Sequence, residues 1–230
     1  MANSINTNMG AMVALQNLNA TSRELNVAQN RVNTGKNIAS AKDNGAIWAI
    51  AQNQKANMGV LNATRNALQR TQSVNDVGLA AGDTIMEALR QMKELAAGPA
   101  STARDADLAA LSAEVTAARA AASFDGTNAL SAALTLTIAA APTAGQIDAD
   151  LASAITALQT LGTSSKSTER SLVFNEKLQD ALETGIGNLI DADLARESAR
   201  LTALQTKQQL GVQALGIANQ SSSILLGLFR

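Results

Sequence analysis

The two ends of this chain carry apolar residues at helical spacing, and neither end can bury its apolar side chains alone. The residues that we expect to pack there are Ile5, Met9, Met12, Leu15, Leu18, Leu25 and Val32 at the N-terminal end, and Leu194, Leu201, Leu204, Leu215, Ile224, Leu225, Leu228 and Phe229 at the C-terminal end. Steps of three, four and seven place such residues along one stripe of a helix, and the stripe needs a second apolar surface. The opposite end and other copies of the chain can both supply it. The pattern favours a polymer subunit and leaves an ordinary intramolecular coiled coil of the two ends open.

The polar residues of both ends are mostly uncharged. Asn is frequent in the first 37 residues, and no acidic residue follows Glu197. A helix in water usually carries Lys and Glu on its free face, whereas amides and hydroxyls suit a helix that is contacted on several sides, because burying an unpaired charge is costly. Isolated helices of this kind are marginal. We therefore expect the two ends to become ordered on polymerisation.

The composition excludes several classes of function. The chain has no Cys and no His, so thiol nucleophiles, imidazole acid–base catalysis and the usual zinc sites are excluded. The net charge is −1 with scattered basic residues, which argues against a nucleic-acid partner. The apolar runs are far shorter than the ~18 residues of a membrane span, and the first residues lack a secretory signal pattern. We expect no enzyme, cofactor, metal site or membrane insertion.

Periodicity and helix-breaking residues predict a mainly α fold, a long antiparallel helical bundle with one small β-hairpin. The predicted elements are a helical arm ending near Asn33–Gly35, a connector over 33–46, a long helix from 47 to 97 stopped by Gly98 and Pro99, a helix over 105–122, a hairpin near 124–141, a helix over 148–181 and a final arm from 189 to 230. The alternating segment Leu134–Ile138 is the main signal for the hairpin. Gly162 is a candidate interruption of the third helix, and Gly185 and Gly187 are candidates for a bend before the final arm.

Several blocks of sequence, in the right order, resemble bacterial flagellin over nearly the whole chain. They are INTN (5–8), NRVNTGKNIASAKDNGAIWAIA (30–51), the long-helix segment ending in MKELA (65–97), FDGTNAL (124–130), IDADLARES (190–198) and the terminal ANQSSSILLGLFR (218–230). The resemblance implies a structural subunit of the flagellar filament, used for swimming motility. It also implies that residues 1–46 and 187–230 pair as a coiled-coil-like inner layer, while 47–186 form an outer bundle. The stretch from 130 to 148 has room only for the hairpin, so we expect a short form without variable outer domains.

The resemblance further implies partners and a location. The chain is expected to assemble with itself, and to contact the flagellar export apparatus, an export chaperone, and the hook-associated junction and cap proteins. Co-assembly with other flagellins is left open. The chain is expected outside the cell, exported without a cleaved signal peptide. Two alternatives stay open, a hook–filament junction protein with similar terminal stripes and, less favoured, a secreted amphipathic helical factor.

One departure from the family pattern concerns the long helix. Many flagellins carry an Arg in a QRVREL segment that contacts the animal Toll-like flagellin receptor, and the corresponding segment here is RQMKEL. Gln91 stands at the position of that Arg, while Glu94 and Leu95 are retained. Since an amide does not replace a guanidinium, the resemblance implies a receptor-contact region of doubtful activity.

Three small clusters have structural interpretations that we prefer to chemical ones. Asp191, Asp193 and Glu197 suit the N-terminus of a helix better than a metal site. Ser40 and Lys42 form too weak a pattern for a nucleophilic pair, and a hydrogen-bonding role in the connector is favoured. The hydroxyl-rich segment 163–168 leaves glycosylation undecided.

Overall fold

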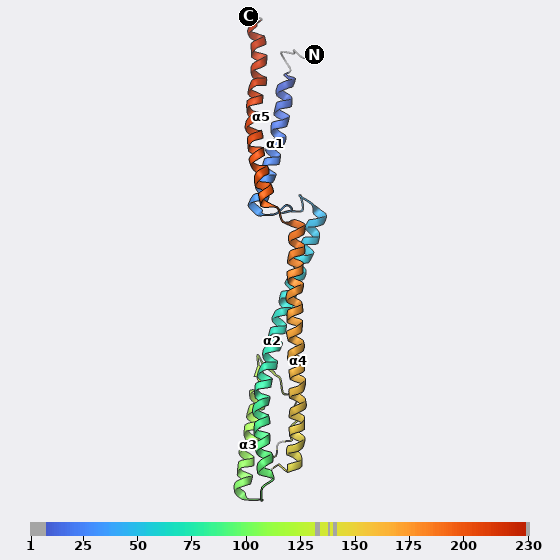
Figure 1. Cartoon of the computed structure of the whole chain (residues 1–230), viewed down its shortest axis with the longest axis vertical. Helices are drawn as coiled ribbons and strands as arrows, with labels where there is room; N and C mark the ends of the chain where they lie inside the picture. The colour runs from blue at the N-terminus through green and yellow to red at the C-terminus, as the bar shows by residue number, and fades with distance from the viewer. Residues whose placement is uncertain (1–7, 132–133, 138, 140–141, 229–230) are drawn as a thin grey trace. The chain divides into compact units, whose positions relative to one another are not determined.

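The computed structural model describes residues 8–131, 134–137, 139 and 142–228, with side chains described as far as 220. The described elements are the helices α1 (Met9–Thr34), α2 (Gly45–Ala96), α3 (Thr102–Ala121), α4 (Ala144–Ile190) and α5 (Leu194–Leu228), and the strands β1 (Ser123–Phe124) and β2 (Thr127–Asn128). The mainly helical fold with one small hairpin is confirmed (Figure 1). Packing divides the chain into two units, Met1–Asn57 with Leu182–Arg230, and Met58–Ala181.

Helix ends fall where side chains or glycines satisfy the backbone. The Asn8 side chain accepts a hydrogen bond from the Ala11 N–H at 3.0 Å, which caps α1. Gly35 ends the helix with φ 67°, a left-handed conformation that favours glycine. The predicted stop of the first arm at 33–35 is therefore confirmed.

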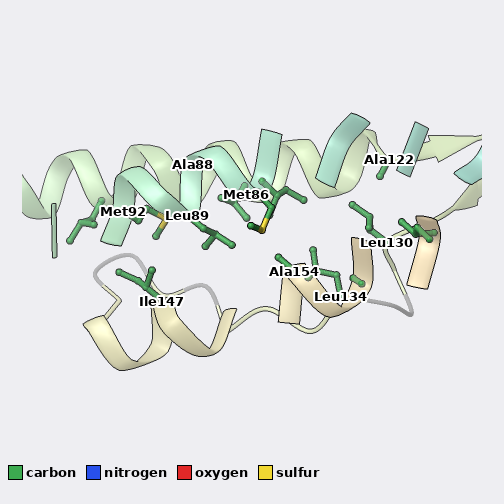
Figure 2. Close-up of a cluster of buried hydrophobic side chains, with 14 residues drawn as sticks. Met86, Ala88, Leu89, Met92, Ala122, Leu130, Leu134, Ile147 and Ala154 are labelled. Atoms are coloured by element: carbon green, nitrogen blue, oxygen red, sulfur yellow. The ribbon is translucent and has the colours of Figure 1, made fainter. Parts of the chain in front are cut away.

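The core of the Met58–Ala181 unit lies between α2, α3, α4 and the segment after the hairpin. Its largest fully buried side chains are Ile85, Leu89, Met92, Leu108, Val115, Leu130, Leu134 and Ile147. Figure 2 shows Met86, Leu89 and Met92 of α2 facing Ala154 and Ile147 of α4. Close packing also depends on Gly82, because a Cβ atom there would lie 2.2 Å from Leu158 Cδ2. Large side chains on one helix thus occupy space left by small residues on the next.

The hairpin lies earlier in the chain than the alternating segment Leu134–Ile138 that was its main sequence signal. β1 and β2 pair antiparallel around Asp125 and Gly126, both with positive φ. Leu134–Thr137, the described part of the alternating segment, forms no strand. The Thr137 N–H donates to buried Asp150 at 2.8 Å, and Ser112 Oγ donates to the Ala139 carbonyl at 3.0 Å. Helix side chains thus bond the backbone that we expected to pair as strands, and our interpretation of this segment was wrong.

Helix α4, which we predicted over residues 148–181, is longer than expected. α4 begins at Ala144 and continues without a break through Gly162, Gly185 and Gly187 to Ile190. Gly162 and Gly185 have open space around them, so neither marks a close approach or a turn. The chain leaves the helix at Asp191–Asp193, a few residues after the bend that we predicted.

Candidate functional site

The paired helices α1 and α5 form an antiparallel two-stranded coiled coil (Figure 1). Between Leu194 and Gln220, the residues that are buried or half-buried follow steps of four and three without exception, namely Glu197, Leu201, Leu204, Gln208, Gly211, Leu215 and Ala218. The matching positions of α1 are Ala11, Ala14, Leu18, Thr21, Leu25, Ala28 and Val32. This is the heptad repeat of a coiled-coil seam, with two seam positions in every seven.

Small residues let the two helices approach closely in this seam. Leu18 lies against Gly211, where an added Cβ would be 3.2 Å from the Leu18 Cδ1 atom. Leu25, Ala28 and Leu204 form a separate small core. The intramolecular contact therefore uses only one narrow stripe of each helix.

Polar contacts fix the register at both ends of the seam. At one end, the Asn8 side chain donates to the Ala218 carbonyl at 2.8 Å. At the other, Arg31 Nη1 donates to Glu197 Oε1 at 3.2 Å, with both side chains largely buried. Because a half-turn slip would break both contacts, these pairs specify how α1 and α5 align.

The connector joins the start of α5 through backbone bonds. The Asn37 N–H donates to the Ile190 carbonyl at 2.8 Å, and the Ala192 N–H donates to the Gly35 carbonyl at 2.9 Å. Asp193 then caps α5, accepting from the Ala195 N–H at 3.0 Å. Asp193 therefore acts as the helix-terminal carboxylate that we preferred to a metal ligand.

Within the connector, Asp43 organises a tight turn. Its Oδ2 atom accepts hydrogen bonds from the Ser40 N–H at 2.9 Å and the Ser40 hydroxyl at 3.1 Å. The Ser40 N–H is the main cause that lowers the pKa of the Asp43 carboxyl. Ser40 is thus bonded to Asp43, and its predicted hydrogen-bonding role is confirmed.

Toward one end of the coiled coil, the outer faces expose large apolar side chains and carry no charge. We call this part the uncharged end, and it comprises residues 9–22 of α1 with 208–220 of α5. These two ranges contain no charged residue. The large hydrophobic side chains exposed there are Met9, Met12, Val13, Leu15, Leu210, Val212 and Ile217, with exposed fractions from 48% to 69%. These apolar side chains lie among exposed amides, such as Gln16 and Gln213, and not among Lys and Glu. Among the described residues, the uncharged end therefore leaves large apolar side chains uncovered within a single chain.

The residues that we expected to pack at the two ends divide between the seam and the outer faces. Leu18, Leu25, Val32, Leu201, Leu204 and Leu215 lie in the seam, whereas Met9, Met12, Leu15 and Leu194 are exposed. The side chains of Ile224, Leu225 and Leu228 lie outside the described ones, and Ile5 and Phe229 lie outside the described residues. Sequence reasoning missed Thr21 and Gly211, whose signal was their heptad spacing.

The segment that corresponds to the receptor-contact region lies on α2 in the other unit. Gln91 is exposed and donates to Glu87 at 3.3 Å, and Glu94 is exposed as well. Leu95 is half-buried and packs against the core. Gln91 and Glu94 are therefore accessible in the isolated unit.

Neither a metal-binding cluster nor a membrane-spanning helix is found in the part of the chain that the structure describes. This part holds no group of three or more acidic residues arranged to bind a metal ion. No described helix has the length and hydrophobicity to cross a bilayer.

Two family profiles together match nearly the whole chain. The profile of the bacterial flagellin N-terminal helical region matches residues 5–135, and that of the bacterial flagellin C-terminal helical region matches 144–229. Flagellins FljM and FljK of Caulobacter vibrioides are 50% and 48% identical, and each alignment covers 99% of both chains. A flagellin of Brucella melitensis is 31% identical, again with 99% of both chains covered. The Caulobacter alignments run over 270 positions, so those relatives carry residues that this chain of 230 lacks.

Proposed function

This chain belongs to the bacterial flagellin family, and we propose that it joins its filament through the outer faces of the α1–α5 coiled coil. As a flagellin it is a structural subunit of the extracellular flagellar filament, associates with copies of itself, and is not an enzyme. The Caulobacter and Brucella relatives align with this chain over 99% of both lengths, which fits a short form without outer domains. The proposal concerns which surface makes the polymer.

The observation that carries this proposal is the exposed apolar surface of the uncharged end. The seam between α1 and α5 already buries one stripe of each helix. The intramolecular coiled coil therefore leaves the apolar side chains of Met9, Met12, Leu210 and Ile217 exposed. Burying one such side chain contributes about 1.5–3 kcal/mol. Neighbouring copies with the same faces supply that burial many times over along a filament.

The same reasoning assigns the two ends of the chain to an inner layer. We place residues 1–46 and 187–230 in the filament core and 47–186 in the surrounding bundle. The uncharged surface supports this arrangement, since charges would be desolvated between packed helices. Export without a cleaved signal peptide, binding to the export apparatus and its chaperone, co-assembly with other flagellins, and contacts with junction and cap proteins are proposed on family membership alone.

A substitution on the exposed face tests the assembly surface. Ile217→Asp is expected to raise the critical concentration for polymerisation at least about tenfold, because a carboxylate must then be buried between copies. The Ile217 side chain is 69% exposed, so the coiled coil within one chain should be retained. Light scattering measures the critical concentration, and negative-stain electron microscopy shows whether filaments form.

The matched control places the same charge toward the charged end of the helix. Gln205→Asp changes an exposed residue of α5 that lies outside the uncharged end and outside the seam. It should polymerise much closer to the unmodified chain than Ile217→Asp does. Equal critical concentrations for the two variants would argue that the uncharged end is not the assembly surface.

The receptor-contact region gives a separate proposal. We expect weak activation of the Toll-like flagellin receptor, because Gln91 offers an amide where the family pattern has a guanidinium. Gln91→Arg should increase signalling in a receptor-reporter cell assay, at equal concentrations of depolymerised protein. Equally strong activation by both proteins would refute the expectation.

A further inference from the structure

The five methionines in the part of the chain that the structure describes differ in their exposure. Met86 and Met92 belong to the core of the Met58–Ala181 unit, with exposed fractions of 9% and 2%, and Met58 is half-buried. Met9 and Met12 are 62% and 60% exposed. Both exposed thioethers therefore lie on the outer face of α1, within the uncharged end.

Exposure decides how readily a methionine is oxidised. The thioether sulfur attacks an oxygen of a peroxide, the O–O bond breaks, and the products are a sulfoxide and water, with two electrons passing from sulfur to the peroxide. This reaction needs access to the sulfur atom and no deprotonation. The chain contains no Cys, so no thiol competes for the oxidant or confuses the readout.

The sulfoxide changes the chemistry of the surface on which it forms. It replaces an apolar, flexible side chain with a polar one whose oxygen needs a hydrogen-bond donor. Around Met9 and Met12 the helix presents Val13 and Leu15, and the opposing end of α5 presents Leu210, Val212 and Ile217. An interface that packs these apolar side chains against the thioethers must desolvate the sulfoxide oxygen, so it loses complementarity once both sulfurs are oxidised.

We propose that Met9 and Met12 form an oxidation-sensitive assembly site, at which peroxide oxidation of the free subunit blocks polymerisation while the same residues inside a filament are shielded. The inference rests on the proposed function of the uncharged end. It adds a modification site, and it names oxidation as the condition under which the uncharged end no longer supports assembly. It also predicts an asymmetry, since subunits are vulnerable before assembly and protected afterwards.

The experiment compares subunits and filaments of the full chain treated with hydrogen peroxide. Peptide mass spectrometry measures the gain of one oxygen at each methionine, and light scattering measures the critical concentration after the peroxide is removed. Oxidised subunits should show sulfoxide at Met9 and Met12 before Met86 and Met92, and a critical concentration raised at least about tenfold. Filaments treated in the same way should show slower oxidation at both positions.

Two further measurements assign the effect to these residues. The double variant Met9→Leu with Met12→Leu keeps an apolar side chain of similar size, and it should polymerise equally well before and after peroxide. Met58→Leu is the matched control and should remain sensitive. Methionine sulfoxide reductase should restore polymerisation of the oxidised unmodified chain, which gives a reversible readout independent of any substitution.

The outcomes separate this inference from the function on which it rests. If the untreated chain forms no filaments, the proposed function fails and the inference falls with it. If the untreated chain forms filaments and the fully oxidised chain forms them equally well, the inference alone is overturned. It is also overturned if the double variant loses polymerisation on oxidation as the unmodified chain does, or if reductase treatment restores nothing.

Discussion

A chain that lacks residues 219–230 is expected to remain a soluble subunit under conditions in which the full chain forms filaments. The deletion removes Ile224, Leu225, Leu228 and Phe229. Each apolar side chain buried in a filament contributes about 1.5–3 kcal/mol to the free energy of association. Since about 1.4 kcal/mol changes the critical concentration tenfold, the loss of four such side chains raises it by several orders of magnitude. Electron microscopy and sedimentation of the polymerised fraction measure the result.

The same deletion should leave the Met58–Ala181 unit intact. The core of that unit is built from residues between 79 and 161, which the deletion does not reach. Its thermal unfolding, followed by circular dichroism, should therefore match that of the full chain. Leu225→Asp provides a variant of unchanged length and should also fail to polymerise. Normal filaments from the truncated chain would contradict the assignment of the chain ends to the polymer interface.

Much of the fold could be predicted because the relevant signals are local. Asn33, Gly35 and the Gly98–Pro99 pair mark helix ends through backbone preferences that do not depend on distant contacts. The long apolar periodicities between these signals identify helices by the same reasoning. The resemblance to flagellin then predicted that the chain is a filament subunit, and the comparisons confirm this.

The errors occurred where distant side chains decided the local structure. Alternation in Leu134–Ile138 suited a strand, yet Asp150 and Ser112 bond the neighbouring backbone from two helices. Gly162 looked like an interruption, but α4 continues because the packing of Leu158 and Leu161 against α2 favours a continuous helix there. Neither contact can be found from the spacing of nearby residues.

Periodicity identified the apolar residues of the two ends, but it did not predict how they divide between the seam and the outer faces. In the segment from Met9 to Leu15, apolar residues occupy nearly every helical position, so periodicity alone could not separate a seam from an outer face. The seam depends instead on small residues such as Thr21 and Gly211, which hydrophobicity scarcely marks. That the two ends become ordered only on polymerisation stays a prediction.

The second large effect concerns stability of the outer bundle. Ile85 is fully buried at the centre of the core, with 0% of its surface exposed. Ile85→Ala is expected to lower the free energy of unfolding by about 2–5 kcal/mol, because it removes three buried carbons and leaves a cavity. A domain of this size is stabilised by only about 5–15 kcal/mol. The midpoint of urea unfolding, followed by circular dichroism, should fall accordingly.

Ile155→Ala makes the same chemical change on the surface of the same unit, since Ile155 is 50% exposed. Its effect should stay within about 1 kcal/mol, because little apolar area is lost and Ala has the higher helix propensity. The difference between the two variants isolates burial from the intrinsic cost of replacing isoleucine in a helix. Similar losses for both would mean that the cluster around Ile85 is not the stabilising core. A different result is that Ile85→Ala alone loses much of its free energy of unfolding and still polymerises at saturating subunit concentration. That result would show that the stability of the Met58–Ala181 unit and assembly through the chain ends are separate properties.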